Sequence, residues 1–237
     1  MYFLENYGGS KLTVRREDNT GSQIWITNLN KVLSAKSFTI LPDETEVIFS
    51  RYSNNNAFGI VRLNAADGVL IQHLETNDYF SQQEWLQAVP TSDNNNVYFS
   101  GYHSSNDEPV ICKLILGDTD IDCFTATGMS KSNMAFTLIS DTELFMIWVK
   151  DVGPMNMIFQ RLTWSSTSPA WSYEVTCPDG SLCSHGYAHA LMSADNTQVY
   201  TLTSFGQTKY AYFIVLDSLT GNVVQGDAPL IFKSSSV

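Results

Sequence analysis

The chain has 237 residues, of which 43% are hydrophobic and 12% aromatic, so it is long and apolar enough to bury a sizeable core. Charged residues make up only 16%, and 13 Lys and Arg against 24 Asp and Glu give a net charge of −11. This acidity disfavours nucleic acids and anionic lipid surfaces as partners, and the absence of a long apolar run argues against membrane insertion by a helix.

Four segments of the chain align on a turn-forming aspartate and recur at intervals of 50, 48 and 54 residues. The anchors are Asp43, Asp93, Asp141 and Asp195. Each anchor follows one short β-prone run and precedes three more, and Gly, Asn, Asp or Pro residues separate the runs. Four antiparallel strands at this period are typical of a β-propeller, because sheets packed radially bury each other's faces.

The pattern assigns residues 1–237 to a single all-β propeller domain with five blades' worth of four-stranded antiparallel sheets. We expect complete blades at about residues 36–76, 85–127, 133–177 and 186–227. Residues 1–30 repeat the unit without its first strand, and residues 228–237 contain a lone strand that we expect to complete this first blade. The two alternatives are a closed five-bladed ring and part of a larger, seven- or eight-bladed propeller.

Four cysteines fall into two local pairs, which favours an oxidising, extracellular location. If residues 117–118 form a hairpin turn, Cys112 lies directly opposite Cys123 and close enough to bridge it. Cys177 and Cys183 close a short loop. We predict both disulfides, with free thiols as the alternative.

The turns between the third and fourth strands share Asp and Gly at residues 17–25, 63–72 and 216–225, and the first and last of them also carry Thr before the Gly. These turns resemble the A-x-D-x-x-T-G-x-x-x-W docking repeat of the quinoprotein (PQQ)-like, alcohol-dehydrogenase-like β-propeller family. The resemblance implies that Trp25 and Trp171 pack between blades, and two repeats carry Gln instead. It covers nearly the whole chain at the level of blades. The cofactor-using members need eight blades, a calcium ion beside the quinone and an Asp base, which are not recognisable here, so we expect no cofactor.

The sharpest cluster of potential metal ligands comprises Cys177, Cys183, His185 and His189. Two thiolates and two imidazoles can form a tetrahedral zinc site. The spacing differs from that of a common zinc finger, however, and two histidines four residues apart on a strand lie too far apart to share an ion. We therefore expect a disulfide and ordinary histidines there.

Carboxylates do not form a convincing catalytic pair either. Three aspartates alternate at residues 118–122, which could bind calcium but fits a solvated outer strand better. The first strands of the four complete repeats carry no Asp or Glu, although propeller glycosidases need such residues there, and Glu84 is the only nearby acid. We expect no catalytic residue and no metal site.

Trp164 and Trp171 flank an exposed, Ser- and Thr-rich turn, and they are the candidate ligand surface because aromatic rings stack on the apolar faces of sugars. A core or docking role is the alternative for both. Loops at residues 54–56, 103–107 and 178–185 could form the rest of a binding surface.

These observations predict a non-catalytic extracellular module that binds protein partners or self-assembles, with its last strand pairing to a neighbouring molecule. A carbohydrate-binding propeller and a fragment of a quinoprotein-like oxidoreductase are the alternatives.

Overall fold

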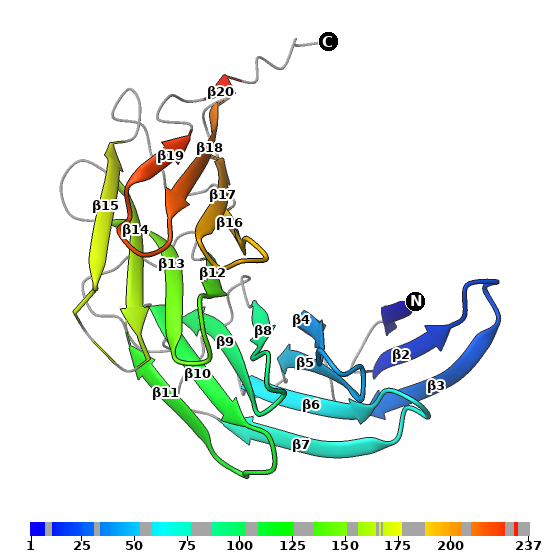
Figure 1. Ribbon diagram of the computed structural model, residues 1–237. Helices are drawn as coiled ribbons and strands as arrows, with labels where there is room; N and C mark the ends of the chain where they lie inside the picture. Colours follow the sequence, from blue (N-terminus) through cyan, green and yellow to red (C-terminus); the bar gives the residue numbers. More distant parts are fainter. Residues whose placement is uncertain are drawn as a thin grey trace. The chain divides into compact units, whose positions relative to one another are not determined.

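A computed structural model describes most of the chain (Figure 1). The described residues are 1–7, 11–30, 34–52, 58–76, 87–102, 109–125, 135–150, 156–164, 166, 168–176, 188–204, 210–225 and 230–231. They form two compact units. The first comprises Met1–Asn106 with Val110–Cys123, and the second comprises Asp107–Pro109 with Phe124–Val237.

The first unit is built from three antiparallel sheets. The first sheet has three strands, β1 (Tyr2–Tyr7), β2 (Lys11–Glu17) and β3 (Gln23–Asn30). The second sheet has four, β4 (Ser34–Ile40), β5 (Glu46–Tyr52), β6 (Phe58–Asn64) and β7 (Leu70–Thr76). The third sheet comprises β8 (Ala88–Pro90), β9 (Asn96–Tyr102), β10 (Pro109–Ile115) and β11 (Ile121–Thr125).

The second unit is built from two sheets in the same up-and-down order. The fourth sheet comprises β12 (Ala135–Leu138), β13 (Glu143–Lys150), β14 (Asn156–Thr163) and β15 (Trp171–Thr176). The last sheet comprises β16 (Ala188–Met192), β17 (Gln198–Ser204), β18 (Tyr210–Asp217) and β19 (Val223–Gln225), and a short β20 (Leu230–Ile231) also pairs with β18.

Among the described residues, this architecture confirms the all-β class, the four-stranded repeat and the missing first strand of the first sheet. The prediction for the lone strand near residue 230 is wrong, because β20 pairs with β18 of the last sheet and not with the first sheet. Ala211 of β18 pairs with Ser204 on one side and with Leu230 on the other, so β20 lies on the same edge as β19. The two short strands are therefore pieces of one interrupted outer strand.

The anchor aspartates shape the turns between the first and second strands of the repeats. The carboxylate of Asp195 accepts hydrogen bonds from the backbone N–H and hydroxyl of Thr197, at 3.1 and 2.8 Å. Asp43 and Thr45 make the same pair of bonds. These local bonds replace ladder bonds that the turn cannot make, which explains the recurrence of Asp.

The core lies between sheets because the strands bury alternate residues on each face. One cluster joins the first and second sheets through Val14, Phe49 and Val61, and another joins the second and third through Ile48, Phe99 and Leu114. In the second unit, Phe145 and Phe159 of the fourth sheet belong to the same cluster as residues of the last sheet. The described residues contain no helix that could span a membrane.

The predicted hairpin disulfide is present in the third sheet. Cys112 and Cys123 are bonded, their Cα atoms are 4.1 Å apart, and Cys112 is fully buried. The bond joins β10 to β11, as the Gly-Asp turn predicted. Cys177 and Cys183 lie outside the described residues, so the second disulfide stays a prediction.

Candidate functional site

The most developed polar site in the first unit joins the first sheet to the second. Trp25 of β3 is only 6% exposed, and its indole N–H donates to the carbonyl oxygen of Ala65 at 2.9 Å. The guanidinium of Arg16, which pairs with Trp25 in the ladder, donates to the same oxygen at 2.6 Å. The indole ring lies on Gly68, where an added Cβ would be 2.5 Å from the ring. We call this Trp–Arg–carbonyl–Gly arrangement a tryptophan latch.

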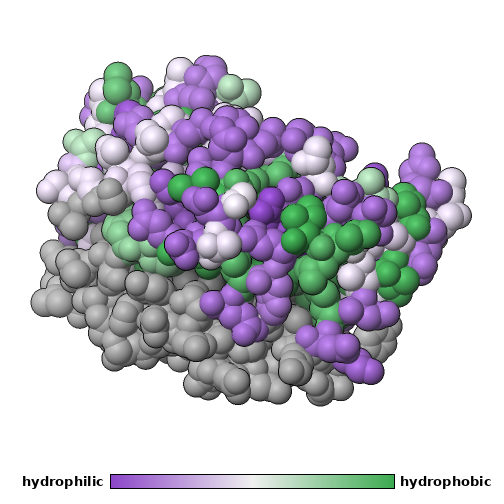
Figure 2. Space-filling view, turned by 90° about the horizontal axis from the view of Figure 1, so that it is seen from below, coloured by the Kyte–Doolittle hydropathy of each residue, from purple (hydrophilic) through white to green (hydrophobic). Residues whose placement is uncertain are grey.

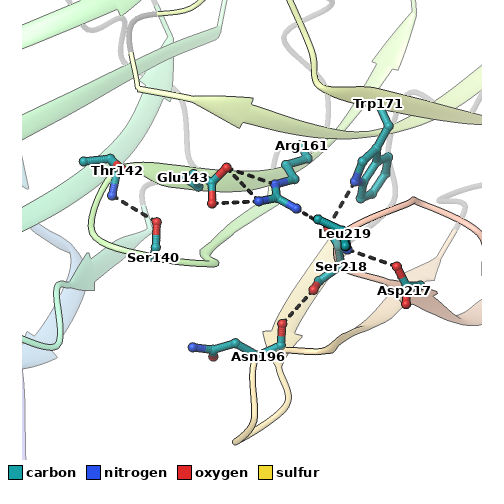
Figure 3. A network of polar contacts seen from close by, with 9 residues as sticks. All are labelled: Ser140, Thr142, Glu143, Arg161, Trp171, Asn196, Asp217, Ser218 and Leu219. Atoms are coloured by element: carbon teal, nitrogen blue, oxygen red, sulfur yellow. Dashed lines mark hydrogen bonds and ion pairs between the residues drawn. The ribbon is translucent and has the colours of Figure 1, made fainter.

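A second tryptophan latch joins the fourth sheet to the last sheet. Trp171 and Arg161 both donate to the carbonyl oxygen of Ser218, each at 3.1 Å, and the indole covers Gly221. Figure 3 shows Arg161 between the carboxylate of Glu143 and the turn that carries Ser218. Both carboxylate oxygens of Glu143 accept bonds of 2.7 Å from Arg161, so the guanidinium is held in place from its own sheet.

The contact from the second sheet to the third uses an amide at the same position. Gln72 pairs with Arg62 in the ladder, as Trp25 pairs with Arg16, and its side-chain N–H donates to the carbonyl oxygen of Asp118 at 2.7 Å. Arg62 donates to the Gln72 side-chain oxygen at 2.6 Å and to Glu46 at 2.7 and 2.8 Å. A Cβ added at Gly117 in the facing turn would meet nothing within 4 Å.

In all three contacts, a side chain of one sheet donates a hydrogen bond to a carbonyl oxygen in a turn of the neighbouring sheet. The docking resemblance predicted Trp25 and Trp171 correctly as packing residues. Sequence reasoning missed the arginines and their glutamate partners. A signal for them was available, because a basic residue occupies the same place before the turn in four repeats. The four residues are Arg16, Arg62, Lys113 and Arg161.

The turns also perturb the ionisation of their aspartates. The Thr20 hydroxyl and the backbone N–H of Ser22 lower the pKa of Asp18 below its usual value, and the Thr220 hydroxyl does the same to the pKa of Asp217. Hydrogen bonds from Thr91 lower the pKa of Asp93. Those from Ser193 and Thr197 lower the pKa of Asp195. Each cause is local to its turn, so these shifts reflect turn capping.

The two tryptophans of the candidate ligand surface have different surroundings. Trp171 is half-buried and packs on Phe145, with ring centroids 5.8 Å apart, in addition to its latch contacts. These contacts give it the docking role that the sequence offered as the alternative to a ligand contact. Trp164 is half-buried beside the turn and makes an edge-to-face contact with Phe124 at 5.2 Å. A ligand role for either residue stays a prediction.

The structure describes only some of the remaining candidate residues. His189 is exposed on β16, and Cys177, Cys183 and His185 lie outside the described residues. Asp120 and Asp122 are exposed, as expected of a solvated strand. Within the described part of the chain, no three His, Cys, Asp or Glu side chains are grouped so that they could hold a metal ion. Glu84 and the three candidate loops at 54–56, 103–107 and 178–185 are also outside it.

A cleft of about 570 Å³ opens beside the first sheet. Its lining residues include Arg16, Asp18, Gly21, Ile24 and Glu44. Arg16 already donates to Ala65, and Asp18 already accepts from Thr20 and Ser22, so these two groups hold the fold together.

Large apolar side chains are exposed on several strands, and Figure 2 shows hydrophobic residues in clusters among hydrophilic ones on the face turned to the viewer. On the outer strands of the first unit they include Ile24 and Ile26 of β3 and Leu70 and Ile71 of β7, each between 45% and 47% exposed. On the last sheet they include Leu191, Tyr200 and Leu202.

Comparison with known proteins supports the propeller-type fold. No family model matches the chain, and no curated protein matches it. Among solved structures, a Synechocystis apocarotenoid oxygenase mutant is 10% identical, with a TM-score of 0.58 over 98% of this chain. The Dos1 propeller is 12% identical, with a TM-score of 0.57 over 95% of this chain. A periplasmic gluconolactonase from Pseudomonas aeruginosa is 12% identical, with a TM-score of 0.54 over 93% of this chain.

The chain spans only part of these structures, namely 57% of the oxygenase, 56% of the Dos1 propeller and 64% of the gluconolactonase. At such low identity the likeness establishes the fold alone. The chain therefore has a propeller-type fold, built from antiparallel sheets that are four-stranded except at the two terminal sheets.

Proposed function

We propose that this chain is a non-catalytic β-propeller module that serves as a structural or protein-interaction component of an extracellular or cell-surface assembly. The observation that carries the proposal is the set of exposed apolar side chains on the outer strands. Ile24, Ile26, Leu70 and Ile71 are each nearly half exposed. Apolar surface of this kind, bordered by polar residues, is typical of sites where proteins bind one another.

Two further observations support a scaffold role. The arginines and indoles of the latches are used in holding neighbouring sheets together, and the turn aspartates are used in capping turns. The Cys112–Cys123 disulfide suits an oxidising compartment, which supports a location outside the cytosol.

The proposal is tested by capture of partners with the full chain and a surface variant. The double variant Leu70→Lys, Ile71→Lys changes two exposed side chains, and Leu219→Lys is the matched control because Leu219 is 71% exposed in a turn elsewhere. We expect cross-linking mass spectrometry on an extracellular fraction of the source organism to map protein partners to β3 and β7. Binding should fall at least about tenfold in the double variant and stay unchanged in the control. Equal binding by all three proteins would contradict the proposal.

A carbohydrate-binding function is the second candidate, and the half-buried Trp164 beside the Ser- and Thr-rich turn favours it. A glycan array with the wild-type chain and the variants Trp164→Ala and Trp171→Ala separates the two functions. Specific glycan binding that both variants lose would replace the protein-interaction proposal. Dye reduction after reconstitution with quinone and calcium would instead support the fragment of a quinoprotein-like oxidoreductase.

A further inference from the structure

The outer strands of the five sheets, each the last strand of its sheet, differ in length and in charge. Three of them carry a carboxylate, namely Glu75 of β7, Asp122 of β11 and Glu174 of β15, and β19 has only three residues. β3 is the longest, with eight residues, and Gln23–Asn30 contain no charged residue. Charges and short length are the usual means by which an edge strand avoids pairing with another chain, and β3 has neither.

The edge of β3 that faces away from β2 is regular, and we call it the outer edge of β3. Residues 25–30 pair one by one with residues 16 to 11, without a register shift. Within the described part of the chain, only β2 pairs with β3, and no backbone hydrogen bond joins residues 23–30 to a turn or loop. Figure 1 shows β3 at the margin of the first unit. Because an antiparallel strand turns alternate N–H and C=O groups to each side, this edge presents a row of unpaired backbone groups.

The start of the sequence does not account for this unpaired edge. The first strand that this sheet lacks, relative to the second, third and fourth sheets, would lie beside β1. β1 and β3 are the two opposite margins of the sheet, so a strand beside β1 would not reach the outer edge of β3. The contacts of β3 with the second sheet all lie within the first unit.

An apolar surface of the second sheet lies next to the outer edge of β3. The Thr27 hydroxyl of β3 donates to the carbonyl oxygen of Gly68 at 2.6 Å, and the Trp25 ring lies on the same glycine. Two residues further along the chain, Leu70 is 47% exposed. Its ladder partner Leu63 is fully buried in the core between the first and second sheets. Because cross-strand partners share a face, Leu70 points to the side of the first sheet, which ends at β3 and leaves it open to solvent.

A strand added beside β3 would find contacts for its backbone and for its side chains. Its backbone would continue the ladder of the first sheet. On one face, its alternate side chains would lie beside Thr27 and over Leu70, where apolar residues are favoured. On the other face, which we call the free face of the first sheet, they would lie beside Ile26, whose ladder partner is Arg15. These contacts fit an extended segment with apolar residues at alternate positions.

A second copy of the chain fits the outer edge of β3 poorly. In a symmetric pair of such edges the two strands would be about 4.8 Å apart, with the same faces turned to the same side. Each β3 already has its own Gly68 turn under Trp25 and Thr27. The two turns would therefore compete for the space over Leu70. The net charge of −11 adds repulsion between copies, and it favours a neutral or basic segment as the occupant.

We propose that the outer edge of β3 binds an extended segment of another protein, which joins the first sheet as a further strand. The segment has apolar residues at alternate positions, which contact Leu70, and it carries no net negative charge. In this mode of recognition the backbone hydrogen bonds supply affinity and the alternate side chains supply specificity. The inference rests on the proposed function, because it names the kind of partner that the surface with Ile26 and Leu70 binds.

A peptide library tests the strand pairing with the full chain. The library displays peptides in which Val, Leu, Ile, Phe or Tyr alternates with Thr, Ser or Lys, and fluorescence anisotropy measures the strongest binder. Its control is the same peptide N-methylated at two successive central residues, which removes an N–H from each edge and keeps every side chain. We expect the methylated peptide to bind at least about tenfold more weakly. Absence of any binder, or equal binding by the two peptides, would overturn the inference.

Hydrogen exchange followed by NMR locates the pairing independently. Alternate amides of β3 should exchange rapidly in the free chain and become protected when the selected peptide binds. Leu70→Ala should weaken binding at least about threefold, whereas Leu219→Ala, at a leucine that is 71% exposed in a turn elsewhere, should leave it unchanged. Protection of all β3 amides in the free chain would mean that another part of the chain or a second copy occupies the edge. That result, or peptide-induced protection confined to other strands, would overturn the inference.

Failure of this inference is distinguishable from failure of the proposed function. A partner whose capture depends on Leu70 and Ile71, but which leaves the β3 amides unprotected, would remove the strand pairing and leave the proposed function intact. Specific glycan binding that requires Trp164 and Trp171 would remove the proposed function, and it would leave the peptide measurements unaffected.

Discussion

Two contacts in the first unit each hold a turn of the neighbouring sheet, but they do so with different chemistry. Trp25 holds the turn of the second sheet by packing on Gly68 and by donating to Ala65, whereas Gln72 holds the turn of the third sheet by one hydrogen bond to Asp118. The indole needs a glycine beneath it, and the amide does not, since the space above Gly117 is open. The comparison indicates that the tryptophan latch stabilises mainly through apolar packing, and the amide contact only through its hydrogen bond.

Truncation of the two side chains tests this difference most strongly. We expect Trp25→Ala to lower the free energy of unfolding by about 3 to 5 kcal/mol, because a large buried ring is lost. Gln72→Ala should lower it by about 1 to 2 kcal/mol, because the hydrogen bonds of its side chain to Asp118 and from Arg62 are lost. Urea denaturation of the full chain measures both. Losses of equal size would show that packing does not distinguish the contacts.

Filling the space at the turn glycines separates the contacts by a second route. Gly68→Ala should lower the free energy of unfolding by about 3 kcal/mol, because the new methyl group would be 2.5 Å from the Trp25 ring and the backbone has a φ of +73°. Gly117→Ala should cost only about 1 kcal/mol, because its positive φ is unfavourable but nothing crowds it. The same urea titration applies, and a cost at Gly117 as large as that at Gly68 would refute the steric argument.

The disulfide tests how the third sheet compensates for the weaker contact. The double variant Cys112→Ala, Cys123→Ala should lower the free energy of unfolding by about 2 to 3 kcal/mol, because a short loop loses its crosslink in the unfolded state. Thermal unfolding with and without reductant gives the comparison. The wild-type chain in reductant should approach the variant, whereas a reductant-insensitive wild type would show that the bond contributes little.

Substitution of Arg161, the arginine of the second latch, should lower the free energy of unfolding by a smaller amount. Arg161→Lys keeps the charge but loses the paired bonds to Glu143 and the bond to Ser218, so we expect a loss of about 1 kcal/mol by urea denaturation. Arg15→Lys, at an ion pair on the free face of the first sheet, is the control and should change stability less. A larger loss of stability in Arg15→Lys than in Arg161→Lys would show that the bond from Arg161 to the Ser218 carbonyl contributes little.

The turn aspartates give the smallest effect, visible as a dependence on pH. Hydrogen bonds within the turns hold their folded-state pKa values below the usual value for an aspartate. Their contribution to stability is therefore present above that usual value and is lost as the pH falls through the lower folded-state pKa. Asp217→Asn should therefore flatten the acid limb of stability measured between about pH 6 and about pH 3. An unchanged acid limb would mean that the Thr220 bond does not stabilise the ionised form.

The sequence predicted the features that depend on short-range pattern. The Gly-Asp turn placed Cys112 opposite Cys123, and the anchor aspartates located the turns, because strand pairing across a short turn leaves little freedom in register. The residues that clamp turn carbonyls were harder to predict. Arg161 contacts Ser218 across 57 positions, and nothing near Arg161 in the chain reveals that distant partner.

The end of the chain shows why the remaining strand was misassigned. Residues 228–233 have the composition of any first strand, and ring closure offered an attractive partner for it. The structure instead gives β20 to the edge of β18 that β19 leaves uncovered, because β19 spans only Val223–Gln225. The uncovered part of the β18 edge lies closer along the chain to β20 than the first sheet does. Composition alone does not reveal how much of that edge β19 leaves uncovered.

The close contact between Trp25 and Gly68 has a consequence for how such a molecule changes over generations. While the indole is present, no other residue fits at the glycine, so the glycine cannot vary alone. Once a smaller amide replaces the tryptophan, other residues can replace the glycine. A tryptophan can then return only after the glycine has been restored. Loss of the Trp–Gly pair is thus easier than its return, which would let repeats of one chain diverge in sequence while keeping a common architecture.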